Sequence, residues 1–277
     1  MTRTEWDLDP GPPRLRIRVN EWTGSDGGRP PVVILHGFLE QGAAWDAVAT
    51  RLDRRVIAPD HRGHGRSAHV GAGGFYHFWD YVGDLDGLIE HVGGPVDLVG
   101  HSMGGTIAAL YAGSRPDRVR RLALIEGLGP PDAESGAIDR ARAFLADLRD
   151  PPAHPPAVTE VDAADRLRRW NPALSADTAS WLAARLLGGG TWGWDSRHRM
   201  RAPVPFQASI FCRFLREITA PTLIVEGVAS PFRVPDAEAR KAALVQASAV
   251  CIPGGHLLHH DNPGGLANAI TSFLEDS

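Results

Sequence analysis

The residue whose surroundings best fit covalent chemistry is Ser102, in the run Gly100-His-Ser-Met-Gly104. The apolar run 96–99 before it predicts a buried strand, and the Ala- and Leu-rich stretch 106–111 after it predicts a helix. Strand, tight turn and helix are the context that a G-x-S-x-G nucleophile elbow requires. The helix N-terminus would bring free N–H groups and a positive dipole end close to the Ser102 oxygen. The pattern therefore favours a serine nucleophile over a glycine-rich turn that carries a serine by chance.

A serine nucleophile needs a base within hydrogen-bond reach and a carboxylate that orients the base. The strongest candidate for the base is His256, in a Gly-Gly-His turn between a predicted strand and the last predicted helix. Loops at the carboxyl ends of parallel strands are where α/β sheets place their ligands. Two other histidines, His154 and His198, fall in a predicted insertion. The pair His259 and His260 is expected to be surface or packing residues.

These residues must be positioned by alternating strands and helices. Strand-like patterns occur at 14–20, 31–35, 55–58, 96–99, 119–125, 221–227 and 248–252. Helical patterns occur at 42–52, 78–92, 206–216, 235–245 and 263–274. Strands that alternate with helices through short loops predict a parallel sheet covered on both faces, an α/β fold.

The pattern changes between about residue 130 and residue 206. Strand-like runs disappear there, and helical patterns at 139–148, 161–170 and 178–187 alternate with Pro-rich turns. We therefore expect a helical cap at 130–206, inserted after the strand that ends at Glu126, in a core formed by 1–129 and 207–277. Its most distinctive stretch is Trp192-Gly-Trp194-Asp. Either tryptophan could line a substrate pocket, and packing within the cap is the alternative for each.

Composition excludes several classes of protein. The 277 residues are 43% hydrophobic and 22% charged, as in ordinary soluble enzymes, and a net charge of −4 offers no electrostatic footprint for nucleic acid. The two cysteines, Cys212 and Cys251, follow no metal or redox spacing. The polar, Pro-rich first 13 residues contain no apolar run, and no stretch approaches the ~18 apolar residues of a membrane span. We expect a cytoplasmic monomer or homodimer with no membrane or nucleic-acid partner.

Four motifs together resemble the α/β-hydrolase superfamily, and more narrowly its lid-bearing esterase, epoxide-hydrolase and dehalogenase-like branch. They are His36-Gly-Phe38, Asp60-His-Arg-Gly-His-Gly-Arg-Ser67, Gly100-His-Ser-Met-Gly-Gly105 and Gly254-Gly-His256. The resemblance covers nearly the whole chain, and it is specific for the fold but not for the substrate. It implies a mostly parallel central sheet flanked by helices, with an inserted helical cap.

The resemblance does not decide which residue is the carboxylate that orients the catalytic histidine. Many members carry an Asp about three residues past the Gly that ends the strand 221–227, but this chain has Ser230 there, and Asp236 lies too far along. Haloalkane dehalogenases instead take the acid from the end of the strand after the elbow helix, where this chain has Glu126. Burying an unpaired carboxylate there is costly, and a histidine partner would relieve that cost. We expect Glu126 to be the acid, with Glu226 as the alternative; a structural hydrogen-bond acceptor is the other interpretation of Glu226.

The resemblance also implies an oxyanion hole formed by the backbone N–H groups of Phe38 and Met103. Because main-chain groups would do this work, their side chains are expected to wall the acyl pocket. A structural role is expected for His36 and for the basic residues of the loop 60–67. The histidines and their carboxylate neighbours follow no helix-face or finger spacing, so no metal and no cofactor are expected.

These residues predict a serine hydrolase that cleaves a small to medium, apolar carboxylic ester. In this scheme Ser102 forms an acyl-enzyme, His256 transfers the proton to the leaving alcohol, and Glu126 orients the imidazole. A serine at the elbow argues against epoxide or haloalkane hydrolysis, in which a carboxylate stands at that position. A lactone, thioester or C–C bond could be cleaved by the same site, and a non-hydrolytic receptor or cyclase of the same fold remains an alternative.

Overall fold

The computed structural model describes residues 1–9, 11, 14–24, 27–155, 159–172, 174–187 and 192–275, apart from the side chain of Trp170. Its centre is an eight-stranded sheet with the strand order β1-β2-β4-β3-β5-β6-β7-β8. The strands are β1 Thr2–Leu8, β2 Ile17–Thr23, β3 Val32–Leu35, β4 Val56–Pro59, β5 Val96–His101, β6 Val119–Ile125, β7 Thr222–Gly227 and β8 Ala247–Ile252.

All pairings from β4 to β8 are parallel, whereas β1 and β2 run antiparallel at one edge. The inner strands β3 and β4 are buried along their whole length and read as continuous apolar runs in the sequence. Such runs are typical of parallel strands covered on both faces. The expected α/β-hydrolase arrangement, a mostly parallel sheet flanked by helices, is confirmed.

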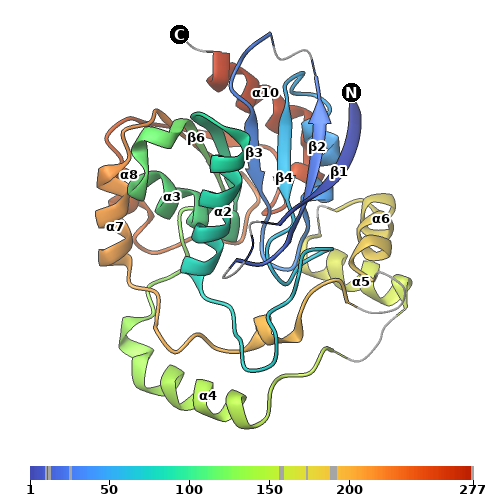
Figure 1. Ribbon diagram of the computed structural model, residues 1–277, viewed down its shortest axis with the longest axis vertical. Coiled ribbons are helices and arrows are strands. Elements are labelled where there is room, and N and C mark those ends of the chain that lie inside the picture. The colour runs from blue at the N-terminus through green and yellow to red at the C-terminus, as the bar shows by residue number, and fades with distance from the viewer. Residues whose placement is uncertain are drawn as a thin grey trace.

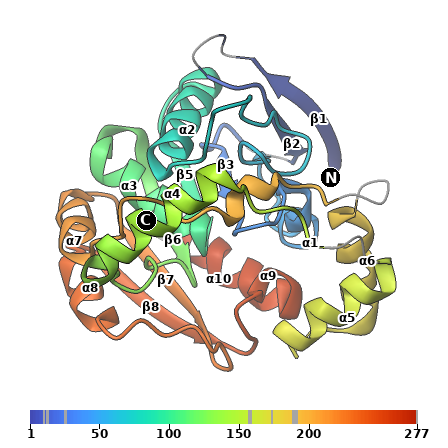
Figure 2. The same cartoon turned by 90° about the horizontal axis from the view of Figure 1, so that it is seen from below.

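Helices cover both faces of the sheet (Figures 1 and 2). On one face lie α2 Phe78–Val92, α3 Met103–Ser114, α7 Ala208–Glu217 and α8 Ala237–Ala243. On the other lie α1 Asp46–Ala49, α9 Leu258–Asp261 and α10 Pro263–Glu275. Two buried apolar clusters, one on each side of the strands, hold the layers together. Among the described residues, no helix is both long and apolar enough to cross a bilayer.

Between β6 and α7 the chain leaves the sheet. This segment carries α4 Ala137–Arg149, α5 Glu160–Trp170 and α6 Ala176–Leu186, together with short 3-10 turns at Glu134–Gly136 and Ser196–Arg199. Helices α5 and α6 pack side by side, and α4 lies apart from them at the lower end of the molecule in Figure 1. We propose that the segment 130–206 is a cap on the core.

Arg240 of α8 holds both points at which the chain passes between core and cap. Its fully buried guanidinium donates to the carbonyl oxygens of Leu128 and Pro130, at 2.9 and 2.8 Å, on the outgoing passage. On the returning passage it lies 5.3 Å from the ring centre of Phe206. The two passages are also joined directly, because the N–H of Ala133 donates to the carbonyl of Phe206 at 2.9 Å.

The N-terminus differs from expectation. The polar stretch at the start of the chain contains β1, which pairs with β2 from Leu8 opposite Ile17 to Thr2 opposite Thr23. Its polar residues are stabilised from β2: Arg18 Nε lies 3.0 Å from Asp7 Oδ1. An edge strand needs only one partner and can present charges to water, so its sequence lacks the apolar run of a central strand.

Two further elements also differ. The helix expected at 42–52 is a 3-10 turn, Gly42–Trp45, followed by the four-residue α1. The short helix α9 was not predicted, because its four residues are too few to show a helical period.

Candidate active site

The turn at Ser102 has the backbone geometry of a strained elbow. Ser102 joins β5 to α3 with φ 51° and ψ −115°, which is unfavourable for a residue with a side chain. Its N–H donates to the carbonyl of Ile125 on β6, and its carbonyl accepts from the N–H of Gly105, both at 3.0 Å. A Cβ on Gly104 would overlap the carbonyl of Leu35. Glycine is therefore needed where α3 passes over β3.

His256 lies in the loop after β8, and its side chain is buried. Its Nδ1 lies 3.1 Å from Glu126 Oε2, and its carbonyl accepts a hydrogen bond of 2.8 Å from Nε2 of His101. His101 directly precedes Ser102, so this bond ties the His256 loop to the elbow. Ser102 Oγ makes no hydrogen bond to any described residue, His256 included. Catalytic contacts are often long in free enzymes and tighten when substrate binds.

Glu126 is placed at the end of β6 with φ 50°, and its side chain is 2% exposed. Besides the contact with His256, its carboxylate accepts hydrogen bonds from the N–H of Gly227, at 2.7 Å, and from the hydroxyl of Ser230. Ser230 stands where the resemblance leads one to expect an acid. Its hydroxyl donates instead to the carboxylate of Glu126, which comes from the neighbouring strand.

The alternative carboxylate points elsewhere. Glu226 Oε2 lies 2.9 Å from Nζ of Lys241 in a partly exposed ion pair. Of the two carboxylates that the sequence left open, Glu126 contacts the imidazole of His256 and Glu226 binds a lysine on α8.

Burial and hydrogen bonding set the charges of the pair. Burial alone would raise the pKa of Glu126, but hydrogen bonds from His256, Ser230 and Gly227 outweigh it and hold this pKa below its usual value. Burial lowers the pKa of His256 below its usual value, although the hydrogen bond with Glu126 opposes the shift. At neutral pH the arrangement is therefore a carboxylate beside a neutral imidazole, which can accept a proton.

The loop after β3 lies beside the elbow and carries the second expected oxyanion donor. Neither the N–H of Phe38 nor that of Met103 donates to any described residue. The loop is held by its neighbours: Nε2 of His36 accepts from the N–H of His61 at 2.9 Å, and Leu39, with φ 61°, donates to His64 at 3.2 Å. Burial lowers the pKa of His36 to about 4, so this ring is a neutral structural acceptor.

The comparisons with known proteins address the family. A family model described as the alpha/beta hydrolase fold matches residues 30–192, which include the elbow and Glu126. The chain belongs to the α/β-hydrolase superfamily.

This α/β-hydrolase is similar to several proteins that are named as lipases or thioesterases. It is 30% identical to a mouse sn-1-specific diacylglycerol lipase over 90% of this chain and 82% of that protein. It is 31% identical to the lipase LipV of Mycobacterium tuberculosis over 88% of this chain and 92% of that one. Among solved structures, a thioesterase domain from the curacin biosynthetic pathway superimposes with a TM-score of 0.85 at 34% identity, covering 98% and 99% of the two chains. Similarity to these enzymes supports hydrolase activity.

In the loop 60–67 of this α/β-hydrolase, Asp60 and Arg62 make internal hydrogen bonds and ion pairs. Asp60 accepts hydrogen bonds from the N–H groups of Gly42 and Arg66, at 2.8 and 2.9 Å. The guanidinium of Arg62 is engaged by both carboxylate oxygens of Asp84, each at 2.7 Å. The guanidinium of Arg62 is thus held in an internal ion pair, and the structural role expected for the other basic residues of the loop stays a prediction.

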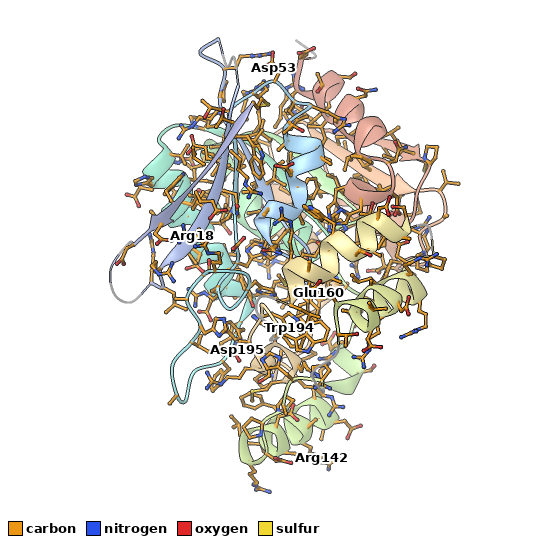
Figure 3. The ribbon with its side chains drawn as sticks, turned by 90° about the vertical axis from the view of Figure 1, so that its right-hand side faces the viewer. Arg18, Asp53, Arg142, Glu160, Trp194 and Asp195 are labelled. Atoms are coloured by element: carbon orange, nitrogen blue, oxygen red, sulfur yellow. The ribbon has the colours of Figure 1, made fainter. Side chains whose placement is uncertain are left out.

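The two cap tryptophans lie where the cap meets the core. Trp194 is buried and forms an isolated β-bridge with His64, and Figure 3 shows it between the strands and Arg142 of α4. The indole N–H of Trp192, a half-buried residue, donates to the carbonyl of Pro155 at 3.3 Å, and the two indole rings are 5.7 Å apart. Both rings pack within the cap and against the core, and their contact with substrate stays a prediction.

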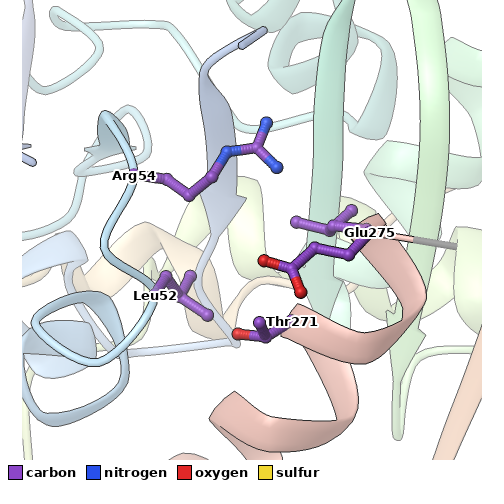
Figure 4. Close-up of a pocket in the computed structure, with 5 residues that line it drawn as sticks. Leu52, Arg54, Thr271 and Glu275 are labelled. Carbon is purple, nitrogen blue, oxygen red and sulfur yellow. The ribbon is translucent and has the colours of Figure 1, made fainter. Parts of the chain in front are cut away.

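A surface pocket lies away from these residues. It is lined by Leu52, Arg54, Thr271, Leu274 and Glu275 (Figure 4). Arg54 lies in the turn before β4 and pairs with Asp97 near the start of β5, at 2.8 Å. The pocket therefore lies at the amino ends of the strands, whereas Ser102 lies at the carboxyl end of β5.

Sequence reasoning missed three neighbours of the site. Phe232 packs on the imidazole of His256 with ring centres 4.1 Å apart, and Glu40 and His101 form a buried pair behind the elbow. No local pattern marks Phe232. Glu40 and His101 could have been found from the sequence, since His101 lies inside a motif used for the resemblance and Glu40 lies close to one.

Proposed function

We propose that this α/β-hydrolase cleaves a small to medium, apolar carboxylic ester through an acyl-enzyme on Ser102. The observation that carries the proposal is the contact between Glu126 and His256, whose loop is bonded to His101, the residue before Ser102. The contact supplies the carboxylate and the imidazole that serine hydrolysis requires, and the strained Ser102 is the proposed nucleophile.

In the proposed reaction Ser102 Oγ attacks the ester carbonyl while His256 Nε2 takes its proton. Glu126 holds the proton of Nδ1, which fixes the tautomer and stabilises the imidazolium that forms. The backbone N–H groups of Phe38 and Met103 receive the oxyanion, and each such donor lowers the barrier by roughly 3 kcal/mol. The imidazolium then protonates the leaving alcohol, and water, activated by the same imidazole, releases the acid.

A thioester is the second candidate substrate. The same attack would expel a thiol in place of an alcohol, and no residue of the proposed triad would change its role. The supporting observation is the likeness to a thioesterase domain along nearly the whole length of both chains. The chemistry of the elbow accepts either leaving group, so the two are separated by measurement.

The test is labelling by a fluorophosphonate probe together with turnover of p-nitrophenyl butyrate and of butyryl-N-acetylcysteamine. We expect the wild type to be labelled and Ser102→Ala to lose both labelling and turnover. Ser114→Ala is the matched control, because Ser114 ends the same helix and its hydroxyl donates to the carbonyl of Leu110. An unlabelled wild type, or turnover that survives Ser102→Ala, contradicts the proposal. A kcat/KM at least tenfold higher for the thioester favours the second candidate.

A further inference from the structure

A second buried cluster of ionisable groups lies behind the elbow. Its centre is the carboxylate of Glu40, whose side chain is 14% exposed. Oε2 of this carboxylate lies 3.2 Å from Nδ1 of His101, and Oε1 lies 2.9 Å from Nε2 of His259. A third imidazole, that of His260, has its Nε2 3.7 Å from Oε1. The proposed triad and oxyanion hole use none of these side chains.

The hydrogen bonds of His101 determine where its protons lie. Nε2 contacts the carbonyl oxygen of His256, which can only accept, so Nε2 carries a proton. Nδ1 faces the carboxylate of Glu40, and a second proton must lie between these two groups. Glu40 Oε2 also accepts the N–H of Gly37 at 2.9 Å, while Oε1 accepts from His259. A carboxylate that accepts several N–H groups is stabilised in its ionised form, which leaves the second proton on His101.

The other groups that face this pair agree with that assignment. Burial lowers the pKa of His259 to about 3, so this ring is neutral and donates through Nε2 while it stacks on Trp45. Burial alone would raise the pKa of Glu40. The imidazoles of His259, His101 and His260 outweigh the effect of burial and hold the pKa of Glu40 well below its usual value.

The same balance acts on His101. Burial opposes its charged form, but the hydrogen bond with Glu40 and the charges of Glu40 and Glu126 outweigh burial and raise the pKa of His101. A positive His101 also disfavours protonation of the nearby His256.

The pair joins three separate parts of the site. Glu40 holds the N–H of Gly37 in the oxyanion loop, His101 is the residue before Ser102, and Nε2 of His101 holds the carbonyl of His256. The contact with the loop is close, because a Cβ on Gly37 would lie 2.6 Å from Glu40 Oε2 and 2.8 Å from His101 Nδ1.

We propose that Glu40 and a doubly protonated His101 form a buried ion pair that positions the oxyanion loop, the nucleophile elbow and the base loop relative to one another. Both are positioning residues, which act through Gly37, Ser102 and His256. The proposal rests on the proposed function for its effect on rate, whereas the protonation state of His101 is independent of any substrate.

The first test is ¹⁵N NMR of the histidine side chains of the wild-type enzyme at pH 7.5. We expect both ring nitrogens of His101 to be protonated, and one of them to lose its proton in Glu40→Gln. A neutral His101 in the wild type overturns the proposal. So does a stoichiometric divalent metal ion, measured by elemental analysis of the purified enzyme, that is lost in Glu40→Gln, because a metal ion would then occupy the place assigned to the proton.

The second test compares the kinetics of Glu40→Gln with those of a matched control, Asp97→Asn. Asp97 is a fully buried carboxylate on the same strand as His101, but it pairs with Arg54 at the opposite end of the sheet. We expect Glu40→Gln to lower kcat about 10- to 100-fold with KM changed less than about threefold, because misplaced catalytic groups cost rate rather than binding. Asp97→Asn should lower the melting temperature and leave kcat within about twofold of the wild type.

A folded Glu40→Gln enzyme with wild-type kcat overturns the positioning role, as does an equal loss of kcat in both variants. If Glu40→Gln does not fold, the NMR measurement on the wild type still decides the protonation state. Failure of the proposed function has a different signature: Ser102→Ala would then match the wild type in turnover, while the NMR result for His101 would be unaffected.

Discussion

Replacing Glu126 by Gln probes the site most directly. The side chain is 2% exposed, and its Oε2 accepts from both His256 Nδ1 and the hydroxyl of Ser230. An amide of the same shape can keep one acceptor, on the N–H of Gly227, but it then places an NH₂ group where Oε2 was. An NH₂ group that faces Nδ1 favours the imidazole tautomer with its proton on Nε2. That tautomer cannot accept the proton of a serine hydroxyl.

The expected loss is large because the tautomer is wrong in the ground state. In serine proteases the corresponding Asp-to-Asn change lowers kcat about 10⁴-fold. Here the hydroxyl of Ser230 can rotate to accept from the new amide, which leaves the fold intact. We expect kcat to fall about 10³- to 10⁴-fold, or roughly 4–5 kcal/mol of barrier, with KM little changed.

The assay is kcat and KM with p-nitrophenyl butyrate at pH 7.5, and Glu226→Gln is the matched control. Glu226 ends the adjacent strand, but its partner is Lys241, and both side chains are about a quarter exposed. A pair so exposed contributes about 1 kcal/mol or less to stability, and its loss should leave kcat within about twofold of the wild type. The assignment of the acid is refuted if Glu126→Gln stays within tenfold of the wild type, or if Glu226→Gln is the more damaged enzyme.

Three further predictions follow from the same contacts. Because burial lowers the pKa of His256 and only the neutral ring accepts a proton, kcat/KM should fall towards acid pH with a midpoint below the usual histidine pKa of about 6.5; a midpoint above that value contradicts the prediction. Ser230→Ala removes one donor to Glu126 and should reduce the free energy of unfolding by about 1 kcal/mol and kcat by less than about tenfold, as urea titration and turnover will show. Arg240→Met leaves Asp236 and two carbonyls without their donor and should cost about 3 kcal/mol of unfolding free energy; a loss below about 1 kcal/mol would show that the buried cation is dispensable.

The fold was predictable because its strong signals are local. The apolar runs that became β3, β5, β6 and β7 are too long and too hydrophobic for an exposed position, and the helices α2 and α10 have clear amphipathic periods. β1 carried no such signal, because its side chains pair with charged groups rather than with a buried face: the indole of Trp6 donates to Glu21 on β2, and Asp7 accepts from Arg16. Its pairing is a property of two strands together.

The site was predictable only as far as motifs reach. Ser102 lies in a sequence pattern that is typical of one backbone geometry, the strand–turn–helix elbow. The contact between Glu126 and His256 joins residues 130 positions apart, and it depends on how close their strands lie in the sheet. The choice between Glu126 and Glu226 shows the limit. Both end buried strands and look alike in sequence, but one carboxylate points towards the loop after β8 and the other towards Lys241 on α8. The pairing of Glu40 with His101 is likewise invisible until the loop after β3 is folded against β5.

The two passages between core and cap lie side by side, held by the hydrogen bond from Ala133 to Phe206 and by Arg240. For a segment whose ends are already together, closing entropy grows only with the logarithm of its length, by about 0.6 kcal/mol for each doubling. Residues could therefore be added to or removed from the stretch around α4, which has no buried side chain, at little thermodynamic cost to the sheet. The helices α5 and α6 differ, because Ala163 and Leu182, together with Leu174 between the two helices, belong to the buried cluster of the core, so their replacement would require the core to repack.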